Sequence, residues 1–574
     1  MSDPRPSNRQ PARKAPGFRE LGIFVAAVAG VLGLVGLVRP WSASKPAQPA
    51  VQQAVTTAQT PAAVGPAPVA PAPVAPTAVA PTAVAPAAPR PPAAVAPPAP
   101  PAKAAEALSA APAVAPPAAP VKPAEPAAPV TQAAAPAATA APAPAPPAPA
   151  TVQARTTMKI QHVKSPGGIE AWLVEEHAVP LLALRFTFDG GNSQDPAGKE
   201  GVANFMSAML DEGAGEFDHA KFQERMEELA FKMSFEDARD AFYGSFETLS
   251  ANRDASLEML RLAISKPRFE AEAVDRIKKQ LLASLAFSAK SPDKIAGKAW
   301  SAAAFAGHPY SRPADGTPES IGTINRDDLE TFRRRNFARD TLRVVAVGDI
   351  DAAQLGAILD KVFGELAPKA ELVAVPMVTP QSNERLKVIE MDVPQSVVQF
   401  GMTGLARKDP DFLPGFILNQ ILGGGGFASR LTEEVREKRG LAYSVYSYLQ
   451  PLKQSAVFGG GVATKNEAVA QSLDVIRAEF KRMADDGPTP AEFANAKSYL
   501  TGSFALRFDS NSKIASQLLW MLQEDMGIDY VEKRNGLVDA VTLDDVKRVA
   551  KRLLKVDDLI VTIVGKPKGL DKKS

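Results

Sequence analysis

The sequence contains no cysteine among its 574 residues and only four histidines. The missing cysteines exclude disulfide bonds, metal sites built on thiolates and catalysis by a cysteine nucleophile. The histidines are His162, His177, His219 and His308, and no two of them are close enough in sequence to lie on one face of a helix. A zinc site built on two histidines one helical turn apart is therefore excluded.

An excess of either charge is also missing, because 65 lysines and arginines nearly balance 63 aspartates and glutamates. The net charge of +2 and the absence of a long basic run after residue 156 leave no electrostatic surface for nucleic acid. With 45% hydrophobic residues, the chain is long enough to bury more than one core. We therefore expect two or more domains and no nucleic-acid partner.

Proline is distributed very unevenly along the chain. Of 53 prolines, 30 lie between Lys45 and Ala150, where they are mixed with alanine and valine and almost no charged or aromatic residues. Such a tract cannot bury enough apolar surface to offset the entropy of ordering it. We predict that residues 39–155 are a Pro/Ala-rich disordered linker.

A long hydrophobic run precedes this linker. Residues 21–38 carry no charge and are long enough to cross the ~30 Å hydrocarbon core of a bilayer. Basic residues outnumber acidic ones in residues 1–20, and this bias predicts a cytoplasmic N-terminal tail. We expect a single-pass signal-anchor in the cell inner membrane, with the bulk of the chain in the periplasm. A cleaved signal peptide is the alternative, although residues 39–41 offer no small-residue cleavage site.

Residues 422–448 contain a loop, a helix, a stop signal and a strand in succession. The loop consists of Gly423, Gly424, Gly425 and Gly426. Consecutive glycines permit a tight turn, and Ser429 is a candidate N-cap for a helix that runs through Leu431 and Val435. Gly440 is expected to end that helix.

The pattern changes to a period of two after Gly440. Leu441, Tyr443 and Val445 are predicted on one face of a strand, and the other face would carry Ala442, Ser444, Tyr446 and Tyr448. Arg436 and Tyr443 would then lie on either side of one turn. From spacing alone, Arg436 could instead pair with Glu433 one turn earlier, with Tyr443 as a half-buried sheet residue.

The sequence after residue 156 matches itself when it is shifted by roughly 215 positions. Residues 181–196 correspond to residues 397–410, each reading as a strand, a polar loop and the start of an apolar helix. Later segments repeat as well, namely 273–286 with 492–505 and 327–348 with 544–565.

This repeat predicts an α+β fold with two homologous domains. Each domain would be a mainly antiparallel sheet with helices on one face. We place the domains at residues 156–365 and 385–574, with a proline-containing connector at residues 366–384.

The motif formed by the glycine run, Arg436, Gly440 and Tyr443 resembles the second-half motif of the pitrilysin-type (inverzincin) zinc metallopeptidases. This family includes mitochondrial processing peptidase and insulin-degrading enzyme, and the resemblance covers nearly everything after the linker. It implies that Tyr443 donates a hydrogen bond to the scissile carbonyl oxygen of a peptide and that Arg436 holds a carbonyl nearby. It also implies that the glycine loop lies near the substrate channel, whereas the residues alone also allow a simple flexible turn.

The same resemblance indicates what this chain has lost. Competent relatives carry His-x-x-Glu-His on a first-half helix and a further glutamate on a second helix. Here Asn204, Ser207 and Ala208 occupy the three helix positions, and the distant glutamate position falls at or near Ser284. Ser207 has no neighbouring base that would make it a nucleophile. A core face remains on that helix, formed by Val202, Phe205, Met206, Met209 and Leu210.

We therefore predict no peptidase activity for the chain alone, no catalytic group at its own zinc site and no bound cofactor or metal. The resemblance implies a non-catalytic, substrate-binding subunit that supplies Arg436 and Tyr443 to a zinc-bearing homologous partner, in a heterodimer or larger complex that binds a peptide substrate. The alternative is a catalytically inert structural or peptide-binding protein with this fold. Decay of the second-half motif would mark that alternative.

Overall fold

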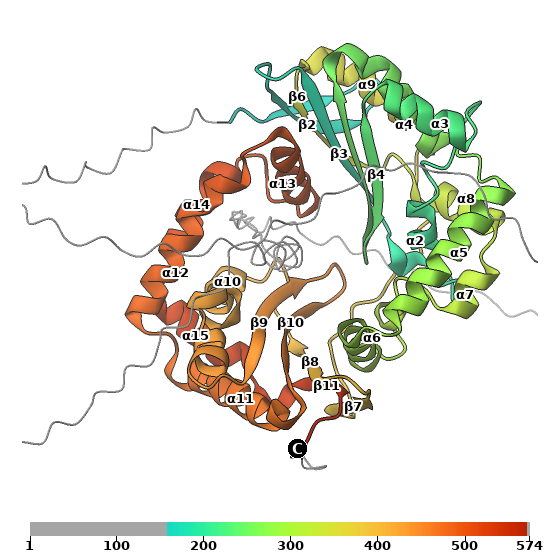
Figure 1. The fold of residues 1–574 in the computed structure, drawn as a ribbon. Helices are drawn as coiled ribbons and strands as arrows, with labels where there is room; N and C mark the ends of the chain where they lie inside the picture. The colour runs from blue at the N-terminus through green and yellow to red at the C-terminus, as the bar shows by residue number, and fades with distance from the viewer. Residues whose placement is uncertain (1–157, 571–574) are drawn as a thin grey trace, which may run out of the picture. The chain divides into compact units, whose positions relative to one another are not determined.

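The computed structural model describes residues 158–570 (Figure 1). The segments predicted as a basic tail (1–20), a membrane anchor (21–38) and a disordered linker (39–155) lie outside the described residues. Within residues 158–570, no helix is both long and apolar enough to cross a membrane, because even the 18-residue helices carry charged side chains. This finding overturns the predicted single-pass inner-membrane and periplasmic location.

Strands and helices alternate in two successive halves of the described chain. The first half contains β1 (Gln161–Lys164), β2 (Glu170–Glu175), β3 (Leu181–Asp189), α2 (Val202–Ser207), α3 (His219–Glu228), β4 (Lys232–Asp237), β5 (Ala241–Leu249), α4 (Arg253–Ser265), α5 (Ala271–Ser288), α6 (Pro292–Ala304), α7 (Pro318–Thr323), α8 (Arg326–Asn336), β6 (Arg343–Gly348) and α9 (Ala352–Phe363). The second half contains β7 (Leu386–Glu390), β8 (Gln395–Thr403), α10 (Phe412–Asn419), β9 (Ala442–Pro451), β10 (Ala456–Lys465), α11 (Val469–Asp486), α12 (Pro490–Gly502), α13 (Asn511–Gln523), α14 (Tyr530–Ala540), α15 (Leu543–Leu553) and β11 (Ile560–Gly565).

The two halves build sheets with the same strand order. The first sheet runs β1-β2-β6-β3-β5-β4 and the second runs β7-β11-β8-β10-β9. One pair in each sheet is parallel, β2 with β6 and β7 with β11, and the other pairs are antiparallel. The second sheet therefore repeats the last five strands of the first, which confirms the predicted mainly antiparallel sheets and their repeat.

Equivalent helices in the two halves also begin in the same way. Asn325 caps α8 and Thr542 caps α15, and in each helix the aspartate at the third position hydrogen-bonds back to the cap residue. This reciprocal capping box satisfies backbone N–H groups that a helix start leaves without a partner. Local sequence thus sets both helix starts, through Asp328 in α8 and Asp545 in α15.

The prediction that helices cover one face of each sheet is incomplete, because both faces are covered. Leu182 and Leu184 of β3 lie in the core of the first half, whereas Ala183 between them lies in the core that includes α13. Helix α13 of the second half packs against β3 and β6 (Figure 1). Because both faces are buried, strands such as β6 read as continuous apolar runs.

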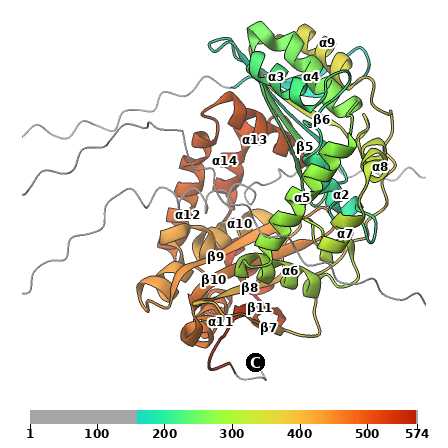
Figure 2. The ribbon, with the colours of Figure 1, turned by 45° about the vertical axis from the view of Figure 1, so that its right-hand side comes forward.

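A helix of the first half likewise packs against the sheet of the second half. Helix α6 packs against β8 and β11 (Figure 2). Trp300 on α6 donates a hydrogen bond from its indole nitrogen to the carbonyl of Ile560 at 3.1 Å. The hairpin between β9 and β10 also contacts the first half, since Lys453 Nζ lies 3.0 Å from Asp189 Oδ2. The far end of β9 is thereby anchored, and its beginning carries the candidate site.

Candidate functional site

Helix α2, which matches the metal-binding helix of the family, keeps its core face. The five apolar residues predicted to form that face are all buried, although α2 ends at Ser207 and Ala208 is its C-cap. The Ser207 hydroxyl donates to the carbonyl of Asn204 at 2.8 Å, and Ser284 on α5 is exposed.

These residues do not fit zinc. An amide, two hydroxyls and a methyl group replace the two imidazoles and two carboxylates of the family site, and zinc prefers nitrogen, thiolate and carboxylate ligands. Within residues 158–570, no group of three or more histidines and acids is placed to hold a metal ion.

An ion cluster ties the segment after α2 to α5. Arg276 on α5 donates to both carboxylate oxygens of the buried Glu212, and these hydrogen bonds to the carboxylate raise the pKa of Arg276. His219 Nδ1 lies 2.8 Å from Glu212 Oε2 without hydrogen-bond geometry. This carboxylate is already paired with Arg276, so the contact holds the segment after α2 against α5.

The glycine-rich segment of the second half is more structured than a flexible loop. Gln420–Gly424 forms a π-helical turn and Gly426–Ala428 a 3₁₀ turn. A Cβ at Gly423 would lie 2.5 Å from the backbone nitrogen of Ser447 on β9, so only glycine fits there. Gly423 is therefore a packing residue, whereas Gly426 is exposed.

The predicted helix after the glycines exists, but it is wider than an α-helix. It begins at Arg430, and Thr432–Glu437 is π-helical, a geometry often found at functional sites. Ser429 precedes it, but its hydroxyl donates to the carbonyl of Gly426 at 2.7 Å and makes no N-cap bond. The predicted side-chain cap is therefore wrong, because the hydroxyl closes the preceding turn instead.

Gly440 ends this helix, as predicted. Its φ of +61° is left-handed, and its N–H donates to the carbonyl of Arg436 at 2.8 Å. The N–H of Leu441 donates to the carbonyl of Val435 at 2.9 Å.

The predicted alternation in the following strand is wrong at its beginning. Opposite β10, Ser444 pairs with Ala463 and Ala442 pairs with Thr464, so Tyr443 is the extra residue of a β-bulge. A bulge shifts the alternation by one residue, and Ala442 and Val445 are therefore both buried while Tyr443 is 56% exposed.

The structure brings Arg436 and Tyr443 together and adds a third residue. The Arg436 guanidinium carbon lies 5.3 Å from the centre of the Tyr443 ring and 4.8 Å from the centre of the Phe427 ring. Both distances are in the cation–π range. Sequence reasoning missed Phe427, for which the signal was a large apolar residue directly after four glycines.

Arg436 does not form the alternative ion pair. Its Nε lies 3.4 Å from Glu437 Oε1, while Glu433 pairs with Lys438 at 3.0 Å. Arg436 is thus half-buried beside two aromatic rings and pairs with its neighbour Glu437.

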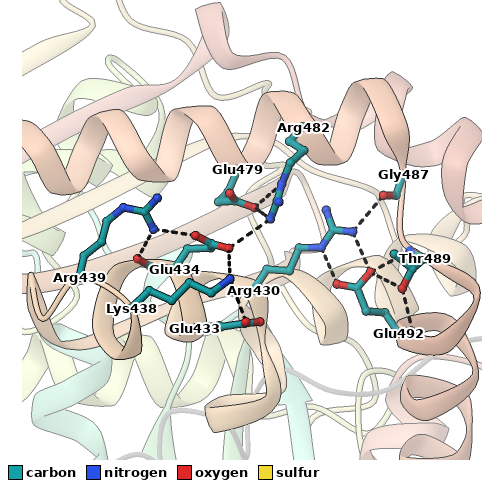
Figure 3. Close-up of polar contacts among 10 residues, drawn as sticks. All are labelled: Arg430, Glu433, Glu434, Lys438, Arg439, Glu479, Arg482, Gly487, Thr489 and Glu492. Atoms are coloured by element: carbon teal, nitrogen blue, oxygen red, sulfur yellow. Dashed lines mark hydrogen bonds and ion pairs between the residues drawn. The ribbon is translucent and has the colours of Figure 1, made fainter.

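Buried charges hold the other side of this helix, as Figure 3 shows. Arg430, which is 7% exposed, donates from Nε and Nη2 to the two carboxylate oxygens of Glu492 at 2.6 and 2.7 Å. Burial would raise the pKa of Glu492, but hydrogen bonds from Arg430 and Thr489 outweigh it and lower the pKa to about 2. Arg430 also reaches the carbonyl of Gly487, which fixes the helix start to the turn before α12.

Glu434 anchors the middle of the helix. It is 7% exposed and accepts hydrogen bonds from Lys438 Nζ at 2.8 Å and Arg439 Nη1 at 2.6 Å, which lower its pKa (Figure 3). Arg482 on α11 lies 3.6 Å away. Residues two apart on a helix point in different directions. Glu434 thus holds the buried side while Arg436 is presented on the exposed side.

Comparison with known proteins identifies this arrangement. Residues 173–317 match the family described as Insulinase (Peptidase family M16), and residues 323–500 match Peptidase M16 inactive domain. A crystal structure of a peptidase M16 inactive domain from Pseudomonas fluorescens is 30% identical, with a TM-score of 0.68, over 72% of this chain and 99% of that one. The chain belongs to the M16 peptidase family. The resemblance to pitrilysin-type peptidases is confirmed, since M16 is that family.

Curated M16 relatives are similar along most of their length. The non-peptidase homolog YmxG of Helicobacter pylori is 26% identical over 72% of this chain and 95% of its own. An uncharacterized zinc protease of Streptomyces coelicolor is 26% identical over 71% of this chain and 91% of its own. The inactive-domain match and the non-peptidase relative are consistent with a non-catalytic M16 protein.

Proposed function

We propose that this M16 protein is the non-catalytic, substrate-binding subunit of a heteromeric zinc metallopeptidase. The observation that carries the proposal is an asymmetry within one chain. Arg436 lies against the exposed Tyr443 ring on a helix that is braced by buried charges, whereas the helix of Asn204, Ser207 and Ala208 carries no metal ligand. A zinc-bearing homologous partner would supply the metal and the general base.

In this proposal the two residues bind the peptide backbone. The Tyr443 phenol donates a hydrogen bond to the carbonyl oxygen on which negative charge develops, and it does so best when the site is preorganised. Arg436 donates from its guanidinium edge to a neighbouring carbonyl, with its face against the aromatic rings. The peptide would be held in extended form, as an added strand on a sheet edge.

The test is cleavage by the purified complex of the full chain with its zinc-bearing homologue. Tyr443→Phe removes one donor to a developing oxyanion and should lower kcat by ~10²–10³. Arg436→Ala should lower kcat/KM and raise KM. Matched controls are Tyr499→Phe on α12 and Arg326→Ala on α8, both exposed residues of the same type, which should leave cleavage unchanged. Unchanged cleavage by both site variants, in a complex that still assembles, would contradict the proposal.

A second candidate is a catalytically inert structural or peptide-binding protein. The observation that favours it is the name of its Helicobacter pylori relative, a non-peptidase homolog. The same variants distinguish the two candidates. An inert peptide binder would show weaker peptide binding in Arg436→Ala but no effect on any cleavage rate, and a purely structural protein would show neither effect.

A further inference from the structure

Phe427 is an exposed aromatic residue that the proposed function does not use. Its exposed fraction is 74%, although burial of a phenylalanine side chain is worth about 1.5–3 kcal/mol. An isolated exposed apolar residue is ordinary on a protein surface. Phe427, however, lies against Arg436, which also contacts Tyr443. Aromatic residues and arginine are the types enriched at the energetic centres of protein interfaces.

A closed turn holds Phe427 in place. The buried Ser429 donates from its backbone N–H to the carbonyl of Gly426 at 3.1 Å and from its hydroxyl to the same carbonyl at 2.7 Å. The Ser429 and Thr432 hydroxyls lie 3.0 Å apart, which ties the turn to the following helix. Upstream, Gly423 packs against the backbone of β9. The ring is thus presented by a braced segment, which reduces the entropy lost when it binds a partner.

The charges around the ring select the kind of side chain it can contact. The Arg436 guanidinium lies 4.8 Å from the ring centre, so a lysine or arginine approaching the ring meets a like charge. The exposed face of the ring itself offers only dispersion and hydrophobic contact. Both features suit a large uncharged apolar side chain.

We propose that Phe427 is a specificity-determining residue that contacts a large apolar side chain of the peptide held by Arg436 and Tyr443. The substrate class would then be extended peptides with leucine, methionine or phenylalanine next to the held carbonyl. This inference rests on the proposed peptide-binding role of Arg436 and Tyr443.

The experiment measures binding of fluorescent peptides to the purified full-length chain by anisotropy. The peptides share an Ala/Ser background in which one leucine, phenylalanine, alanine or lysine is moved through successive positions. A well-placed apolar side chain in a complementary site changes the discrimination between ligands by about 10–200-fold. The wild type should therefore bind the best leucine or phenylalanine peptide at least about 10-fold more tightly than its alanine counterpart. Phe427→Ala should reduce this ratio to about 2 or less, and Phe427→Leu should restore most of it. Phe287→Ala, which removes another exposed phenylalanine, is the matched control and should keep the wild-type ratio.

The outcomes separate this inference from the proposed function. If Arg436→Ala and Tyr443→Phe weaken binding while Phe427→Ala keeps the full preference for apolar side chains, the inference about Phe427 is wrong and the proposed function stands. A uniform loss of affinity for all peptides in Phe427→Ala also overturns it, since specificity would then be unaffected. If the wild type binds no peptide, the proposed function and this inference fall together.

Discussion

The first-half helix α2 and the second-half helix at residues 430–437 both have a buried apolar face, but only the second adds ion pairs to buried charged residues. Apolar side chains hold α2, whereas Asn204 and Ser207, at two of the family's metal positions, are not part of that core and Ala208 packs only against its edge. The second helix buries Leu431 and Val435 and is held in addition by ion pairs, which join Arg430 to Glu492 and both Lys438 and Arg439 to Glu434. Metal-site residues could therefore be lost without disturbing the packing that keeps α2 in place.

The ion pairs of the helix that carries Arg436 are harder to explain by a contribution to stability. Replacing a buried ion pair by apolar residues is often neutral or stabilising, so such a pair is weak evidence for a role in stability. The geometry of an arginine–carboxylate pair, in contrast, fixes the relative orientation of the two side chains as well as their distance, because the carboxylate accepts hydrogen bonds from the edge of the guanidinium. The comparison suggests that the second helix needs a defined orientation, which α2 no longer needs.

The largest expected effect comes from rebuilding the first region. The Ala208 N–H still points to the Asn204 carbonyl at 3.4 Å, so positions 204 and 208 remain one helical turn apart. A variant with Asn204→His, Ser207→Glu, Ala208→His and Ser284→Glu should bind one zinc ion per chain, measured by elemental analysis after gel filtration. Structural zinc sites are worth about 10 kcal/mol or more. A variant with glutamine at all four positions is the control, and a folded rebuilt variant without zinc would show that more than side chains was lost.

Removing the central carboxylate tests the second region. Glu434→Gln leaves Lys438 and Arg439 without their shared partner and should lower the free energy of unfolding by about 1–3 kcal/mol in chemical denaturation. It should also weaken peptide binding about 10-fold, because Arg436 loses its orientation.

A double-mutant cycle separates orientation from stability. If Glu434 acts through Arg436, Glu434→Gln should cause no further loss of peptide binding in the Arg436→Ala background. Glu433→Gln, at an exposed neighbour, is the matched control with little expected effect. Additive losses in the double variant would mean that Glu434 does not position Arg436.

A smaller effect is expected from pH. The folded pKa of Glu492 is about 2, below its ordinary value of 4.5, so its contribution to stability is present above pH ~4.5 and lost as pH falls toward 2. The contribution should be about 2 kcal/mol, reduced from the full shift because the side chain is 31% exposed. Glu492→Gln should therefore reduce the loss of unfolding free energy between pH 5 and pH 2. Urea denaturation at each pH measures this loss. Asp509→Asn, in an exposed pair with Lys513, should change that slope little, and an unchanged slope in Glu492→Gln would refute the assignment.

The smallest expected effect concerns the helix end. Gly440 has a left-handed φ with open space around it, so Gly440→Ala should cost about 1 kcal/mol from backbone strain alone. Gly297 in α6 also has open space but lies in a helix without positive φ, and Gly297→Ala should stabilise by about 0.5–1 kcal/mol. In thermal unfolding, Gly440→Ala should lower Tm and Gly297→Ala should raise it. Changes of Tm in the same direction would contradict this difference.

Local chemistry alone determined a large part of this protein. The replacement of the four metal-site residues was recognised from the family resemblance. The pattern of strand, loop and helix in each half, the core face of α2 and the stop at Gly440, in contrast, are determined by neighbouring residues. Each depends on a short-range rule, such as side-chain periodicity or a glycine at a left-handed position. The role of Arg436 and Tyr443 came from resemblance to a family and not from such a rule.

Only the tertiary structure decided how the site is assembled. The bulge at Tyr443 depends on the register with β10, which local periodicity in β9 does not report. Arg430 meets Glu492 across 62 positions, and α6 and α13 each cover the sheet of the other half. Such contacts arise because distant segments must bury their remaining apolar faces and pair their buried charges, and the choice of partner is made by the whole fold.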